Sequence, residues 1–278
     1  MNLYDAHQHF HFDQLTPHRA TIIRDLKAAG VKGLVVNGTN EDEWPVVAAL
    51  AKEYPWIVPS FGVHPWDAGN RSPDWLAKLR AALVANPGAG VGEIGLDRWL
   101  LELKPDDPRV AGLRVAELEE QTEVFAAQLN LATELDRAPS IHCVQAWGAL
   151  YATLKKSARP ARGFLIHGYA GPAEMIRNFT DLGAYYSFNL QLLEPRHKSR
   201  LENYRHIPVK RLLVETDAPT KAPAGDLNRY PLPPTADGSQ VNNPANIAVA
   251  YEQLAKLRHV PLTTLAPQIE QNFRRLFL

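Results

Sequence analysis

The sequence predicts an α/β protein with the architecture of a (β/α)₈ TIM barrel, folded as a single domain over residues 1–278. Short apolar runs alternate with amphipathic helical stretches, which is the order of a parallel sheet covered by helices. At 278 residues and 45% hydrophobic content, the chain is large enough to bury one barrel-sized core or two smaller ones. The alternative architecture is an open doubly wound sheet. Its dinucleotide-binding form is unsupported, because no Gly-x-Gly-x-x-Gly turn follows the first strand.

The expected strands are short and rich in aliphatic and β-branched residues, as buried parallel strands are. In chain order they are Leu3–His9, Gly33–Asn37, Ile57–Val63, Ala89–Gly95, Pro139–His142, Gly163–His167, Ala184–Phe188 and Arg211–Glu215. Because side chains alternate along a strand, Asp5, His7 and His9 are expected on one face of the first strand.

Helical periodicity connects and follows these strands. The expected helices are Pro17–Ala29, Glu41–Tyr54, Pro73–Ala85, Val115–Asp136, Gln145–Lys156, Pro172–Leu182, Pro195–Tyr204, Pro244–Arg258 and Leu262–Leu276. Gly30 is expected to end the first helix, and Ser72 to cap the third with a proline at its first position. Residues 104–114 and 221–243 are expected to form loops over the C-terminal face of the barrel, where barrel active sites lie.

Composition narrows the function classes. Thirty basic and thirty acidic residues give zero formal charge, so no overall basic surface for nucleic acid is present, although a local patch stays open. The one cysteine, Cys143, excludes an intrachain disulfide framework and is expected to be a small buried residue turned away from any metal. With neither a signal peptide nor an apolar run of membrane-spanning length, we expect a soluble, cytoplasmic protein without a membrane partner.

Metal-type side chains stand at the ends of most expected strands. They are His7, His9, His64, Glu93, His142, His167 and Asp217. The carboxyl ends of barrel strands meet at one mouth, so these side chains should converge there. Four imidazoles and two carboxylates, with His64 left out, are enough for two metal ions. Because two neighbouring dications repel each other, a carboxylate must bridge them, and Glu93 is the candidate.

Each of these residues also has an ordinary interpretation. The first histidines could form a His-rich surface segment, and a single histidine at a strand end is more often a capping or core residue than a ligand. Glu93 and Asp217 could simply complete turns. The joint pattern favours a metal centre, because independent turn residues would not all combine strand ends with metal-ligating side chains.

Several motifs extend this pattern over nearly the whole chain. They are Asp5 to His9, Gly62 to Pro65, Gly92 to Asp97, Ile141-His142, His167-Gly168 and Glu215 to Pro219, with Gln121, Phe125, Gln128, Leu129, Leu131 and Ala132 on a helix and Asn272, Leu276 and Phe277 at the end. In this order they resemble the TatD-type metal-dependent hydrolases, a branch of the amidohydrolase superfamily.

The resemblance implies a binuclear centre with a division of roles. One metal would be held by His7, His9 and Asp217, and the second by His142 and His167. Glu93 would bridge the two ions, and His64 would contact the substrate or the scissile group. Asp5 and Glu215 would orient ligands. The ions are expected among Zn²⁺, Mn²⁺, Co²⁺ and Mg²⁺, with imidazole-rich ligation favouring the first three.

The same resemblance implies hydrolysis of DNA or of a smaller phosphodiester by an activated water, with Asp217 as the group that accepts and returns the proton. The sequence departs from the family pattern at three places where residues that bind the substrate phosphate would be expected. Cys143-Val144-Gln145 replaces a small residue followed by Arg-Asp, and Arg98-Trp99 stands where aromatic residues follow the Gly-Leu-Asp turn. Ser239 to Asn242 stands where basic residues precede Asn-Pro.

Three function classes therefore stay open. The first is a phosphodiesterase or nuclease, which the resemblance favours. The second is an amide, ester or lactone hydrolase that uses the same metal pair, which the zero net charge and the missing arginine favour. The third is a metal-binding protein without catalysis, which is least favoured because every ligand position is filled.

Overall fold

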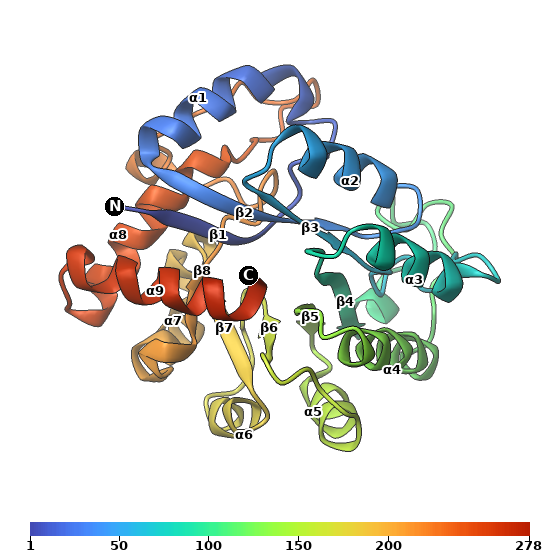
Figure 1. The fold of residues 1–278 in the computed structure, drawn as a ribbon. Helices are drawn as coiled ribbons and strands as arrows, with labels where there is room; N and C mark the ends of the chain where they lie inside the picture. Colours follow the sequence, from blue (N-terminus) through green and yellow to red (C-terminus); the bar gives the residue numbers. More distant parts are fainter.

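Eight parallel strands form the centre of the computed structural model, which describes residues 1–278, and helices surround them (Figure 1). The strands are β1 (Leu3–Gln8), β2 (Val31–Gly38), β3 (Ile57–Phe61), β4 (Val91–Asp97), β5 (Pro139–Val144), β6 (Phe164–Ile166), β7 (Ala184–Phe188) and β8 (Leu212–Val214). Regular ladders join β1 to β3 and β4 to β8 in chain order. Every strand therefore points its carboxyl end the same way.

Backbone hydrogen bonds at two junctions close these ladders into a ring. Between β3 and β4, the N–H of Phe61 donates to the carbonyl of Gly90 at 3.2 Å. Between β8 and β1, the N–H of Asp217 donates to the carbonyl of His7 at 3.0 Å, and the N–H of His9 donates to the carbonyl of Ala218 at 2.7 Å. The predicted (β/α)₈ barrel is confirmed, and its second junction sets the first and last strand ends side by side.

The helices are α1 (Arg19–Ala29), α2 (Trp44–Glu53), α3 (Trp75–Ala85), α4 (Leu118–Glu134), α5 (Trp147–Lys156), α6 (Met175–Asp181), α7 (Lys198–His206), α8 (Ile247–Arg258) and α9 (Leu262–Phe277). Gly30 ends α1 with φ of 82°, as expected. The capping role expected of Ser72 is wrong, because α3 begins at Trp75 and both the hydroxyl and the N–H of Ser72 donate to Glu41 instead. No helix combines the length and the apolarity needed to cross a membrane.

Two glutamines of α4 fasten the strand ends that carry the candidate site. The side chain of Gln128 accepts from the N–H of Val63 at 2.7 Å and donates to its carbonyl at 3.0 Å. Gln121, two helical turns earlier on the same face, makes the equivalent pair of bonds with Asp97 at 2.8 and 3.1 Å. Buried amides paired in this way fix the backbone beside His64 and at the end of β4.

The opposite end of the barrel is covered by α9, which contacts β1 and β8. The amide of Asn272 on this helix donates to the carbonyls of Val209 and Leu212, at 2.8 and 2.7 Å, where β8 begins. A single contiguous hydrophobic cluster of 69 buried residues fills the barrel and the space beneath the helices, and on this basis we propose one domain. Cys143 is a buried free thiol of this cluster.

Candidate metal centre

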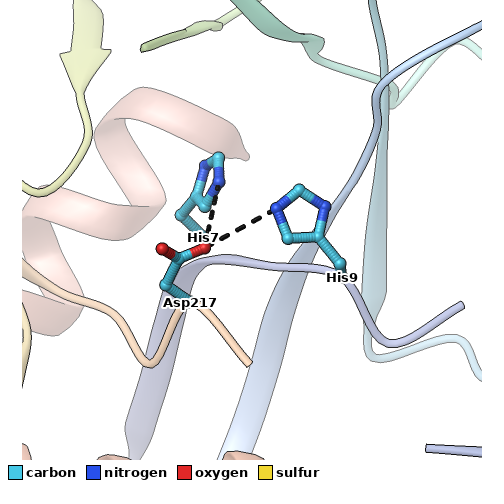
Figure 2. Close-up of side chains that lie close together, drawn as sticks. All are labelled: His7, His9 and Asp217. Carbon is cyan, nitrogen blue, oxygen red and sulfur yellow. Dashed lines mark ion pairs between the residues drawn. The ribbon is translucent and has the colours of Figure 1, made fainter. Parts of the chain in front are cut away.

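The junction of β1 and β8 brings the first three predicted ligands together (Figure 2). His7 lies on β1, His9 follows it, and Asp217 follows β8. Oδ1 of Asp217 lies 3.9 Å from Nε2 of His7 and 3.6 Å from Nε2 of His9. All three side chains are at least nine-tenths buried, so their polar atoms are separated from bulk water.

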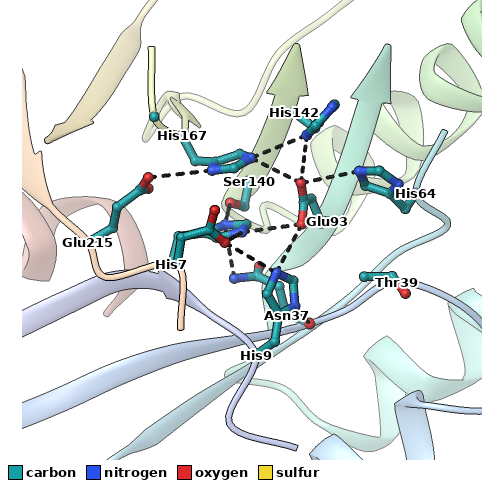
Figure 3. A network of polar contacts seen from close by, with 12 residues as sticks. His7, His9, Asn37, Thr39, His64, Glu93, Ser140, His142, His167 and Glu215 are labelled. Atoms are coloured by element: carbon teal, nitrogen blue, oxygen red, sulfur yellow. Dashed lines mark hydrogen bonds and ion pairs between the residues drawn. The ribbon is translucent and has the colours of Figure 1, made fainter. Parts of the chain in front are cut away.

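Glu93 on β4 lies between two sets of imidazoles (Figure 3). Its Oε2 atom is 3.2 Å from Nε2 of His7 and 3.3 Å from Nε2 of His9. Its Oε1 atom is 2.9 Å from Nδ1 of His142 and 3.0 Å from Nε2 of His167. Each carboxylate oxygen therefore faces a different set of nitrogens, which is the arrangement that a carboxylate bridging two cations requires.

The donor set fits divalent transition metals. Imidazole nitrogens and carboxylate oxygens gather in groups of three whose ligand atoms lie within 4.8 Å of one another. Nε2 of His7 is fully buried and makes no hydrogen bond, although Glu93 lies near. A buried polar atom without a partner is costly unless a cation or a water completes it. All six predicted ligands meet in this one place.

Two of the histidines are oriented through their other ring nitrogen by neutral groups. Nδ1 of His9 lies 2.8 Å from the carbonyl oxygen of Asn37, so it carries the proton and leaves Nε2 free to bind a metal. Nδ1 of His7 lies 2.8 Å from the hydroxyl of Ser140 and 3.1 Å from the amide of Asn37. Both rings therefore present Nε2 to the centre.

The other two histidines are oriented by carboxylates. Nε2 of His142 lies 3.1 Å from Oδ2 of Asp97, and Nδ1 of His167 lies 3.6 Å from Oε1 of Glu215. A carboxylate behind a metal-binding imidazole fixes its orientation and raises its basicity. Asp5 acts differently, because its carboxylate accepts from the backbone N–H groups of His7 and Thr216 and so supports the β1–β8 junction rather than an imidazole ring.

His64 lies beside the cluster but differs from the ligands in its tautomer. Nδ1 of His64 accepts from the backbone N–H of Trp66 at 3.2 Å. The proton of the neutral ring must then sit on Nε2, which lies 3.3 Å from Oε1 of Glu93. His64 is therefore a hydrogen-bond donor at the centre, although its distances to Glu93 and His142 would suit a ligand.

Burial and charge set the protonation states of the centre. Burial would raise the pKa of Glu93, but His167, His64 and His7 hold it well below its usual range. Burial, together with His167, lowers the pKa of His7 to about 4. For His9 the lowering by burial is outweighed by hydrogen bonds with Asp217 and Glu93, which raise its pKa to about 10. An ionised carboxylate surrounded by imidazoles is thus the ground state, and metal uptake would displace protons from the histidines.

For four residues that contact the candidate ligands, the sequence predicts no role or only an indirect one. Asn37, Asp97 and Ser140 contact the histidines, and the ammonium of Lys221 forms an ion pair with Oδ2 of Asp217. Strand alternation would have found two of them, because Asp97 shares a face with Glu93 and Ser140 shares one with His142. Lys221 opens the loop expected over residues 221–243, and nothing in the sequence predicts its contact with Asp217.

One protein family matches almost the whole length of the chain. The family model described as TatD related DNase matches residues 4–278. The chain belongs to this family. In this TatD related DNase chain, the strand-end cluster lies at the carboxyl ends of the strands, which is the face where barrel enzymes carry their active sites.

Two relatives and one solved structure show how far the similarity to this TatD related chain extends. An uncharacterized metal-dependent hydrolase of Bacillus subtilis, YabD, is 28% identical, covering 99% of this chain and 98% of that protein. A protein of Erwinia tasmaniensis named 3′-5′ ssDNA/RNA exonuclease TatD is 30% identical, with 95% of each chain covered. The crystal structure of YjjV, a TatD homologue of Escherichia coli, matches with a TM-score of 0.83 and 27% identity, covering 99% of this chain and 97% of that one.

Proposed function

We propose that this protein is a binuclear metal-dependent phosphodiesterase that cleaves DNA or a smaller phosphodiester. The observation that carries the proposal is the position of Glu93, whose two oxygens face two different pairs of histidines. Relatives named as metal-dependent hydrolases and as a 3′-5′ ssDNA/RNA exonuclease support the same reaction class. Two ions held by His7, His9 and Asp217 and by His142 and His167, bridged by Glu93, would supply Lewis-acid activation of water and of the phosphoryl oxygen.

The residues of the chain would perform the remaining steps. Asp217 is ionised, because the ammonium of Lys221 and the imidazole of His9 hold its pKa well below the usual range against the effect of burial. It would accept the proton of the attacking water and return it to the leaving oxygen. His64 presents its Nε2–H beside Glu93 and is partly exposed, so it would donate a hydrogen bond to a phosphoryl oxygen.

Lys221 favours an anionic substrate over a neutral one. Its side chain is 28% exposed while its ammonium contacts Asp217, so a positive charge lies at the edge of the centre. A cation in this place would attract a phosphodiester and would do little for a neutral ester. Val144 and Gln145 stand where the family pattern has Arg-Asp, so the arginine that would bind phosphate is missing. We propose that Lys221 replaces part of this phosphate binding.

We propose Zn²⁺, Mn²⁺ or Co²⁺ rather than Mg²⁺ as the resident ions, because four imidazoles suit these metals better than a hard cation that prefers oxygen. The second candidate function is hydrolysis of a small neutral ester, amide or lactone with the same centre. The zero net charge of the chain favours this alternative, since tight polynucleotide binding usually rests on a basic surface.

The test is cleavage of single-stranded oligonucleotides in parallel with a panel of esters, amides and lactones, each with Mn²⁺, Zn²⁺ or Mg²⁺. Phosphodiester cleavage is expected, with affinity for long strands falling only shallowly as salt rises. On single strands, each contacted phosphate contributes about −0.7 to the slope of the logarithm of the binding constant against the logarithm of the salt concentration. Few contacts beyond the scissile phosphate are expected, so this slope should be shallow. Turnover of a neutral ester, amide or lactone without any phosphodiester cleavage would overturn the proposal.

A further inference from the structure

Two of the six tryptophans stand apart from the hydrophobic core. Trp44 is buried in the core, and Trp56, Trp75 and Trp147 pack against it, whereas Trp66 and Trp99 do neither. These two partly buried indoles contact each other instead, with ring centroids 6.2 Å apart and planes inclined by 36°. We call them the Trp66–Trp99 pair. Large aromatic side chains kept outside the core need a different explanation from packing.

The Trp66–Trp99 pair is fastened to the metal centre through Asp97. Oδ2 of Asp97 accepts from the indole N–H of Trp66 at 2.8 Å and lies 3.1 Å from Nε2 of His142. Oδ1 of Asp97 accepts from the N–H of Leu100 at 3.1 Å, which fixes the short 3-10 turn that carries Trp99. One carboxylate therefore sets the distance between a candidate metal ligand and both indoles.

The pair also lies on the accessible side of the centre. The side chains of His64 and His142 are 12% and 16% exposed, whereas that of His7 is fully buried. The ring of Trp66 lies 6.5 Å from that of His64. A group bound where solvent reaches His64 and His142 would therefore extend directly onto Trp66.

Neighbouring residues hold Trp99 in place, so its ring belongs to a fixed surface rather than to a mobile loop. The guanidinium of Arg109 lies 4.7 Å from the centre of the indole ring of Trp99 and is itself paired with Asp107. Leu100 and Val110 are buried beneath the same loop, outside the main core. Arg98, the residue before Trp99 in the chain, is exposed and forms no ion pair, so its positive charge is available to an anionic strand.

We infer that the Trp66–Trp99 pair is a nucleobase-binding subsite for an unpaired base next to the scissile phosphodiester, an inference that rests on the proposed function. Unpaired bases stack on aromatic side chains whatever their sequence, and each such contact contributes strongly to binding. Aromatic stacking beside a nearby cation recognises single-stranded nucleic acid without an extended basic surface. This explains how a chain with zero net charge can hold a polynucleotide with few phosphate contacts.

The test compares two substrates with the same phosphodiester, a thymidine dinucleotide and its analogue with one abasic deoxyribose. The wild type should prefer the base-bearing substrate about tenfold in kcat/KM, mainly through KM. Trp99→Leu should remove most of this preference by lowering kcat/KM for the base-bearing substrate far more than for the abasic one, and Trp99→Phe should retain it. Trp75→Leu, which removes a core-packed indole, should leave the preference unchanged.

A binding measurement separates the inference from the proposed function. In the Asp217→Asn background, oligothymidylate should quench intrinsic fluorescence and bind about tenfold more weakly after Trp99→Leu. Cleavage of both dinucleotides with equal efficiency, or a base preference that persists in Trp99→Leu, would contradict the nucleobase-binding subsite. Either result would still be consistent with the proposed phosphodiesterase function. Binding that depends on Trp99, without cleavage of any phosphodiester, would retain the subsite and overturn the proposed reaction.

Discussion

Oδ2 of Asp97 lies 3.1 Å from Nε2 of His142, and this contact leaves Nδ1 of the same ring facing Glu93. His142 is thus the one candidate ligand that turns Nδ1 rather than Nε2 toward the bridge. Asp97 is the hydrogen-bond partner of Nε2, and together with Glu93 on Nδ1 it holds the ring in that orientation. The carboxylate is therefore a positioning group for one of the two ions.

Asp97→Ala should weaken one metal site and spare the other. Loss of such a partner typically costs about 10- to 100-fold in metal affinity. Calorimetric titration of the metal-free variant should resolve one weakened and one unchanged binding event, and Asp97→Asn should recover part of the loss because its amide oxygen still accepts a hydrogen bond. Asp106→Ala, an exposed aspartate of the following loop, is the control. Two unchanged affinities in Asp97→Ala would refute this role.

Asp217→Asn should separate metal binding from turnover. The amide oxygen still offers a ligand atom, but it is too weak a base to accept a proton, so the rate should fall at least about 100-fold. The measurement is kcat on a single-stranded oligonucleotide together with the metal content of the same sample. A near wild-type rate in this variant would show that the proton takes another path.

Lys221→Met should discriminate between charged and neutral substrates. Removing the ammonium that pairs with Asp217 should raise KM for a phosphodiester several-fold and leave KM for a neutral ester unchanged. Lys221→Arg keeps the charge and serves as the matched control. Equal effects on both substrate classes would mean that Lys221 acts only on Asp217 and not on the substrate.

The stability of the metal-free protein should depend on Asp67. Burial and the nearby carboxylate of Glu43 raise the pKa of Asp67 to about 7, from an ordinary value of 3.8. Because the folded state binds this proton more tightly than the unfolded state, stability is fully present below about pH 4 and is lost as pH rises through 7. Asp67→Asn should therefore melt above the wild type at pH 8, with an advantage that fades toward pH 4.

Thermal unfolding of both proteins in chelator at pH 4 and pH 8 measures this difference. Asp106→Asn controls for removal of an exposed carboxylate and should show no comparable rise in Tm at pH 8. An Asp67→Asn protein that gains nothing at pH 8 would mean that the carboxylate of Asp67 is not destabilised by its surroundings.

The sequence was sufficient for the barrel and for the convergence of the candidate ligands at one end of it, because both follow from strand positions and local periodicity. Strand alternation and the shared direction of parallel strands bring His7, Glu93 and Asp217 to one end without knowledge of distant contacts. Helix starts were less accurate. Prolines at positions 195 and 244 open 3-10 turns that precede α7 and α8, so these helices begin three residues later than expected.

The missed features depend on tertiary contacts. The hydroxyl of Ser72 donates to Glu41, a residue of another loop, and this contact replaces the expected cap. The role of Asp97 follows from the register of β4 and β5, in which Gly95 pairs with His142 and sets Asp97 beyond it. Strand alternation places Asp97 on the face of Glu93, but neither register nor loop packing can be read from a single sequence, so the contacts of Asp97 with His142 and of Ser72 with Glu41 required the structure.

The central claim is that Glu93 bridges two ions in one chain. Elemental analysis of protein purified without chelator, reloaded with Zn²⁺ or Mn²⁺ and freed of excess metal, tests it most directly. The account predicts two equivalents per chain for the wild type and a marked loss from both sites in Glu93→Ala, since the two oxygens of Glu93 face both sets of histidines. Saturation of the wild type at a single equivalent would contradict it.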